Sequence, residues 1–160
     1  MSDPTPRAAR PAADAAPSPD AGAGFWRADG TGVLWLGGDD RLAFLQRLTT
    51  NRLTDLAPGH GRSTVLLTDA GRVVDWLACH HGDDGTALVT SHPAAAPAVA
   101  AHLARYVLRD RVRITDASGQ VVVVRLFGRG ATDAAAMLLP GAADAPAGAS
   151  LRRGADEATT

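Results

Sequence analysis

The sequence contains no lysine: all sixteen basic residues of this 160-residue chain are arginines. Schiff-base catalysis and the phosphate-binding loop that ends in Lys-Ser/Thr both need a lysine, so both are excluded. The single cysteine, Cys79, cannot form an intramolecular disulfide or supply several thiolates to a zinc or iron–sulfur site. One unpaired thiol fits a reducing compartment, so we expect a cytoplasmic protein.

Long apolar runs and a strong net charge are also absent. No apolar stretch approaches the roughly 20 residues that a membrane-spanning helix needs. The formal net charge is −1, which disfavours bulk attachment to nucleic acid or to an anionic membrane. Aromatic residues make up 4% of the chain, too few for the stacking platform of a single-strand nucleic-acid binder. We therefore expect neither nucleic acid nor membrane as a partner.

Apolar side chains are concentrated in the middle of the chain. Residues 1–24 are rich in alanine and proline and contain no leucine, isoleucine, valine or aromatic residue. Such a segment has little to bury against the entropy of ordering, so we expect a disordered tail. Residues 25–139 carry a dense apolar pattern of the size of one domain. Residues 140–160 return to small and polar residues, and we expect them to be flexible.

Apolar periodicity and turn residues predict the element order βαβββαββα. The predicted strands cover residues 31–36, 64–68, 72–79, 86–90, 111–115 and 121–127. The predicted helices cover residues 40–49, 93–107 and 132–139. Tight turns join the middle strands, which makes antiparallel hairpins and argues against repeated βαβ units. The predicted fold class is α+β, a mixed, mainly antiparallel sheet with packed helices.

The predicted strand at 72–79 carries a carboxylate among apolar residues. Strand alternation places Asp75 on the same face as Val73, Leu77 and Cys79, and Trp76 on the opposite face. An isolated buried charge costs several kcal/mol, so Asp75 must be paired, hydrogen-bonded or open to a ligand cavity. A partner arginine is the ordinary structural explanation, and a ligand site is the functional one.

Other candidate groups point less clearly to chemistry. Cys79, His80 and His81 are metal-ligand types, but adjacent strand residues face opposite sides, so we predict no metal site. The Gly-x-Ser-x-Gly pattern of a nucleophile elbow does not occur. Four arginines gather at the end of the second predicted helix, where they suit a carboxylate or phosphate ligand or, equally, a solvated face paired with nearby aspartates. They are Arg105, Arg109, Arg111 and Arg113.

An ordered set of motifs runs through the first half of the predicted domain. It comprises Gly-x-Asp at 38–40, Phe-Leu-Gln at 44–46, Thr-Asn at 50–51, Leu-Leu at 66–67, and a glycine followed by hydrophobic residues and an aspartate at 71–75. In this order the motifs resemble the folate-binding family of the glycine-cleavage T-protein (aminomethyltransferase) and YgfZ. The later segment at 103–116 is more similar to the YgfZ branch.

The resemblance implies an α+β domain that binds tetrahydrofolate. The YgfZ signature that begins Lys-Gly-Cys lies in the later part of that family, so we expect the N-terminal portion of a YgfZ-type protein. Such a protein would bind a reduced folate and support iron–sulfur cluster assembly or repair, with cluster enzymes or assembly proteins as partners. The alternatives are a folate-dependent aminomethyl or methyl transferase, and a non-catalytic fragment that associates with a partner chain. Whether the chain is an enzyme stays open.

The resemblance also assigns candidate site residues. Asp75 falls on the first of two adjacent aspartates of the T-proteins, where it would orient the pterin as the candidate catalytic residue. The second position is Trp76, which argues against aminomethyl transfer but would stack on a pterin unless it is a core residue. His92, near a family asparagine, would bind the ligand unless it is a capping residue. Arg109 and Arg113 would meet the glutamyl tail.

Overall fold

The computed structural model describes residues 22–28, 31–121 and 123–139. The predicted tail lies outside these residues up to position 21, and so does the predicted flexible segment 140–160. The elements run in the order β1 (Gly24–Ala28), β2 (Val33–Gly37), α1 (Arg41–Leu48), β3 (His60–Leu67), β4 (Val73–His81), β5 (Thr86–Val89), the 3-10 turn η1 (Pro93–Ala95), α2 (Ala96–Ala104), β6 (Arg113–Asp116), β7 (Val123–Phe127) and α3 (Ala131–Leu138).

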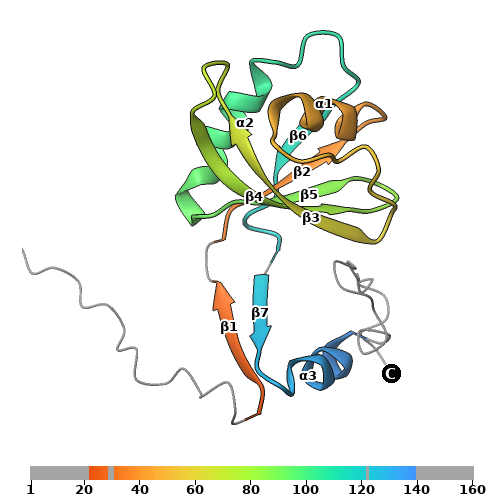
Figure 1. Ribbon diagram of the computed structural model, residues 1–160, viewed down its shortest axis with the longest axis vertical. Helices are drawn as coiled ribbons and strands as arrows, with labels where there is room; N and C mark the ends of the chain where they lie inside the picture. Colours follow the sequence, from red (N-terminus) through yellow and green to blue (C-terminus); the bar gives the residue numbers. More distant parts are fainter. Residues whose placement is uncertain (1–21, 29–30, 122, 140–160) are drawn as a thin grey trace, which may run out of the picture.

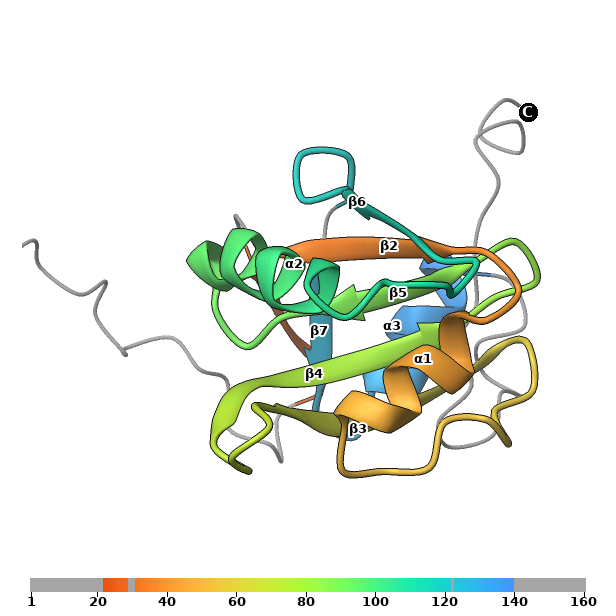
Figure 2. The same ribbon diagram turned by 90° about the horizontal axis from the view of Figure 1, so that it is seen from above.

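The strands form two antiparallel sheets. The larger sheet has the order β3-β4-β5-β2-β6, and β1 pairs with β7 in a separate two-stranded sheet. Helices α1 and α2 cover one face of the larger sheet, whereas β7 and α3 lie on its other side (Figures 1 and 2). The predicted α+β class with packed helices is therefore confirmed. No helix in the described part of the chain is long and apolar enough to cross a membrane.

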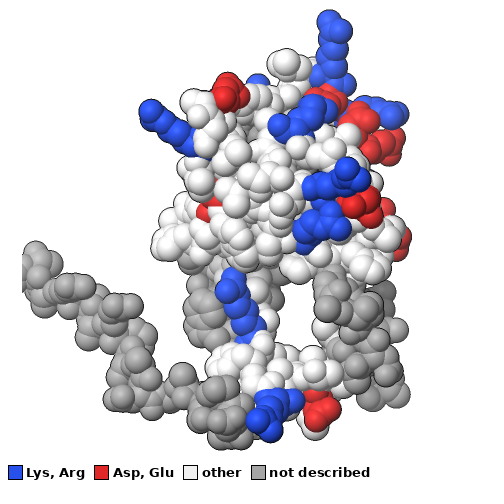
Figure 3. Space-filling model, viewed as in Figure 1, with Lys and Arg blue, Asp and Glu red and all other residues white. Residues whose placement is uncertain are grey.

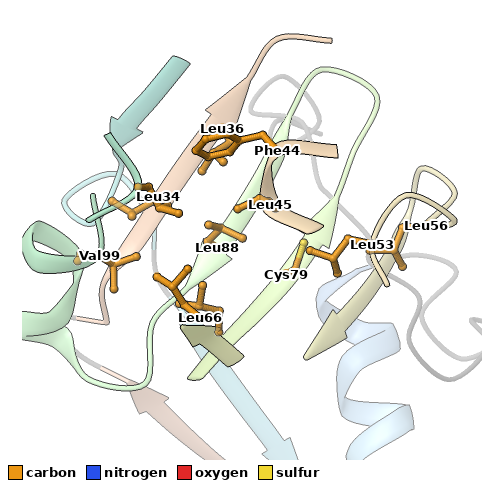
Figure 4. Packing of buried hydrophobic residues seen from close by; sticks show 13 residues of the cluster. Leu34, Leu36, Phe44, Leu45, Leu53, Leu56, Leu66, Cys79, Leu88 and Val99 are labelled. Carbon is orange, nitrogen blue, oxygen red and sulfur yellow. The ribbon is translucent and has the colours of Figure 1, made fainter. Parts of the chain in front are cut away.

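The main core fills the space between the larger sheet and the two helices. Every second residue of each central strand faces inward, and the helices add residues at helical spacing. Figure 4 shows these side chains converging from β2, α1, β3, β4, β5 and α2. The fully buried members include Leu34, Leu36, Phe44, Leu45, Leu66, Leu77, Cys79, Leu88, Val99 and Leu103.

Strand β4 alternates as the sequence predicts. Asp75, Leu77 and Cys79 are buried, and Trp76 is exposed on the opposite face. Val73 was expected beside Asp75, but it is 69% exposed. The register explains the difference: Leu66 pairs with Asp75 whereas Leu67 pairs with Val73, so a bulge interrupts the ladder beside the β3–β4 turn.

Several elements differ from the prediction in their bounds, such as β3, which begins at His60 and not at residue 64, and three differences have an identifiable cause. Strand β1 was not expected, and its Gly24 belonged to the predicted tail; its partner β7 lies far along the chain, so no local hairpin signal announces it. The second predicted helix begins as the turn η1, and α2 ends at Ala104 because Tyr106 donates to the Leu103 carbonyl in a tight turn. Strand β6 begins at Arg113 because the preceding backbone is held by the residue before α1: the Arg111 N–H donates to Asp40 Oδ2 at 2.8 Å.

Gly38 fixes the approach of α1 to the segment before β6. Its φ is +99°, a conformation that favours glycine. A Cβ built at this position would overlap the Arg111 carbonyl oxygen. Both the backbone conformation and the contact therefore require a residue without a side chain.

We expect Gly38→Ala to destabilise the fold by at least about 2 kcal/mol, because it adds left-handed strain and a backbone clash. The measurement is urea unfolding followed by circular dichroism. Gly37→Ala is the matched control, since a Cβ at Gly37 meets nothing within 4 Å. Equal midpoints for the two variants would contradict this account of the α1 start.

The thiol of Cys79 is buried in the main core. Burial raises the pKa of this thiol to about 12, with the Arg62 charge as a smaller opposing influence. The thiolate, which is the reactive form, is thus scarce at pH 8. We expect no reaction with Ellman's reagent at pH 8 in the native protein and complete reaction in denaturant. Prompt labelling without unfolding would show that the core is open at Cys79.

Candidate functional site

The buried carboxylate of Asp75 is bound by one serine. Asp75 is 7% exposed. Its Oδ2 accepts a hydrogen bond from the Ser91 backbone N–H at 3.2 Å, and its Oδ1 accepts one from the Ser91 hydroxyl. None of the ion pairs among the described residues involves Asp75, so the partner arginine offered as the structural explanation is not found there.

Ser91 belongs to a short connection that is anchored on the neighbouring strand. The Thr90 N–H donates to the Gly32 carbonyl at 2.9 Å. The Thr90 hydroxyl lies 3.1 Å from the same carbonyl and 2.9 Å from the His92 carbonyl. It has one proton and can donate a hydrogen bond to one of these two oxygens at a time. Ser91 and His92 are exposed. Asp75 therefore lies just beneath an exposed rim at the start of η1.

His92 is a capping residue of η1. Its Nδ1 accepts a hydrogen bond from the Ala94 N–H at 3.1 Å, and Pro93 follows it at the first position of the turn. This is the structural alternative that the sequence left open. The ring shares the rim with Ser91, and only its Nε2 is left for another partner.

Trp76 is on the other face of β4 from Asp75. It is 42% exposed and pairs across the sheet with Val65. Trp76 is therefore not part of the main core, and it does not face the same side as Asp75, because successive strand residues point to opposite faces. The structure does not bring these two predicted site residues together.

Arg113 lies at the other end of the sheet from Asp75. Arg113 pairs with Gly37, next to the row that joins Leu36, Thr86 and His81. His81 is about 20 Å from Asp75 along β4, at about 3.3 Å per residue. Strand β6 is also separated from β4 by β5 and β2. Arg113 therefore does not share a site with Asp75.

Arg109 belongs to a charged region between α2 and β6. Basic and acidic side chains are interleaved on the side of the molecule near α1 (Figure 3). Arg47 pairs with Asp110 at 2.8 Å, and Arg111 pairs with Asp39 at 3.2 Å. A cavity of about 320 Å³ opens here, lined by Gly38, Asp110, Arg111, Val112 and Arg113. Ion pairing thus accounts for much of this charge, and the region is separate from Asp75.

The two histidines at the end of β4 lie on opposite faces of the strand. His81 is buried, with its Nδ1 3.1 Å from the Thr86 hydroxyl, whereas His80 is exposed on the opposite face. Burial, reinforced by the Arg41 charge, lowers the pKa of His81. Within the described ranges no three metal-ligating side chains gather where they could hold an ion.

Sequence reasoning missed Ser91 as the partner of Asp75. Of the candidate residues taken from the sequence, only His92 belongs to this connection, and it caps η1. The two residues that meet are sixteen positions apart, so no local pattern pairs them. The sequence did offer one signal, the predicted hairpin of strands 72–79 and 86–90. In such a hairpin, which the structure shows as β4 and β5, the residues that follow the second strand lie next to the beginning of the first.

Comparison with known proteins places these features in a family. The chain is 33% identical over 106 residues to the aminomethyltransferase of Cutibacterium acnes, covering 66% of this chain and 29% of that protein. It is 32% identical over 94 residues to the aminomethyltransferase of Exiguobacterium sibiricum, covering 58% of this chain and 26% of that protein. The chain thus spans less than a third of these relatives.

The fold has a solved counterpart. The crystal structure of glycine cleavage system aminomethyltransferase T from Bartonella henselae aligns with a TM-score of 0.64 and 20% identity. The alignment covers 74% of this chain and 32% of that chain. These relatives favour the aminomethyltransferase alternative over the iron–sulfur role, which none of them carries in its name. The family model described as the GCVT N-terminal domain matches residues 20–149, and the chain belongs to that family.

Proposed function

We propose that residues 25–139 form the reduced-folate-binding part of an aminomethyltransferase-type protein, with Asp75 as the residue that contacts the pterin. Family membership supports the ligand class. The observation that carries the choice of residue is the buried Asp75 carboxylate, held by a serine and not neutralised by an arginine. Because the chain spans less than a third of its relatives, the proposal for this chain is folate binding. We retain a cytoplasmic location on the argument from the single cysteine.

The carboxylate has the chemistry that a pterin needs. Each carboxylate oxygen can accept two hydrogen bonds, and Ser91 occupies one site on each. The remaining lone pairs can accept from ring N–H groups of the pterin. Tetrahydrofolate, when bound, supplies the nitrogens that take up the one-carbon unit. Asp75 orients those nitrogens and stabilises positive charge on them, and its burial strengthens this interaction.

The ligand reaches Asp75 over the rim of Ser91 and His92. Both residues are exposed, whereas the opposite side of β4 presents Trp76. His92 adds its free Nε2, because its Nδ1 is used by the Ala94 N–H. We leave Trp76 out of the proposed contact because it is on the other face of the strand. Arg113 is left out because it pairs with Gly37 at the far end of the sheet. Arg109 is left out because it neighbours Asp110, which belongs to the ion-paired region near α1.

We expect the chain to bind 5-formyltetrahydrofolate saturably, and Asp75→Asn to raise Kd at least tenfold, about 1.4 kcal/mol, because the neutral amide loses the charge-assisted hydrogen bonds that the carboxylate accepts from pterin N–H groups. Isothermal titration calorimetry measures both. Asp133→Asn, an exposed change on α3, is the matched control and should bind like the wild type. The absence of saturable binding by the folded wild type, or unchanged binding by Asp75→Asn, would reject the proposal.

A further inference from the structure

We propose that Ser91 is the positioning residue of the Asp75 carboxylate, and that it acts on a bound reduced folate only through that carboxylate. The inference rests on the function proposed above. It adds a residue that neither the family motifs nor the sequence pattern assigns to the site. The structure makes this residue the link between β4 and the connection that leads into α2.

Ser91 holds the carboxylate at two points. Its backbone N–H binds Oδ2 and its hydroxyl binds Oδ1, so both oxygens are fixed by the same residue. The terminal torsion of an aspartate is broad in the absence of such contacts. Two contacts from one residue select a single carboxylate plane, and hence a single direction for the remaining lone pairs. The side chain is then already ordered before the ligand binds, so binding carries no entropy cost for ordering it.

Ser91 is itself held from the opposite side. The Thr90 N–H donates to the carbonyl of Gly32, the residue before β2, and the His92 ring accepts a hydrogen bond from the Ala94 N–H of η1. These contacts fix the residues before and after Ser91 independently of Asp75. The serine therefore serves as a fixed reference for the carboxylate, which stands beside the bulge in β4.

The rival explanation is a direct contact between the exposed Ser91 hydroxyl and the ligand. A hydroxyl has one proton, and here it is donated to Asp75 Oδ1. A direct role would depend on the hydroxyl whatever stands at position 75. A positioning role would depend on the hydroxyl only while a carboxylate is present.

The test is a double-mutant cycle on the binding of 5-formyltetrahydrofolate, with near-UV circular dichroism to establish that each variant is folded. Ser91→Ala should raise Kd about fivefold, and Ser91→Thr, which keeps the hydroxyl and the N–H, should return Kd to within about twofold of the wild type. In the Asp75→Asn background, Ser91→Ala should change Kd by less than about twofold. If Ser91→Ala does not fold, the isosteric pair Ser91→Thr and Ser91→Val replaces it.

Each outcome decides the inference. A Kd unchanged by Ser91→Ala, a loss that Ser91→Thr does not restore, or a loss that persists in the Asp75→Asn background overturns the positioning role while the proposed function stands. A folded wild-type chain that does not bind the folate overturns the proposed function, and the inference falls with it. Loss, rescue by threonine and coupling to Asp75 together support it.

Discussion

The hydrogen bonds between Asp75 and Ser91 are the constraint on which the site depends. A carboxylate inside an apolar layer must be satisfied, and here one serine satisfies both oxygens. The same contact joins β4 to the connection between β5 and α2, which brings the start of η1 over the strand. These hydrogen bonds thus have two structural consequences. They close the edge of the core, and they leave lone pairs of a charged group near an exposed rim.

The sheet order separates this rim from the other charged region of the molecule. Strands β5 and β2 lie between β4 and β6, and the register puts the β6 arginine at the far end. There the α1 start packs on the segment before β6, with Gly38 against Arg111 and ion pairs around it. The two regions have different chemistry. One holds a carboxylate by neutral donors, and the other balances arginines with aspartates.

Local patterns predicted the parts of the fold that local forces determine. Alternation in β4 placed Asp75 and Leu77 inward, and Pro93 marked the start of a helical segment. Contacts between distant segments were not predictable in this way. Strand β1 depends on β7, the Asp75–Ser91 contact depends on the neighbourhood of β4 and β5, and the separation of Arg113 from Asp75 depends on the register. The family resemblance gave the ligand class, but it could not give the geometry.

The most direct measurement is a titration of the isotopically labelled chain with 5-formyltetrahydrofolate, followed by amide NMR shifts. The account predicts saturable shifts at the Ser91 and His92 amides and little change at Arg109 and Arg113, because the ligand meets the carboxylate at the first rim. Shifts confined to Arg109 and Arg113, or a folded chain whose Ser91 amide does not respond, would contradict it.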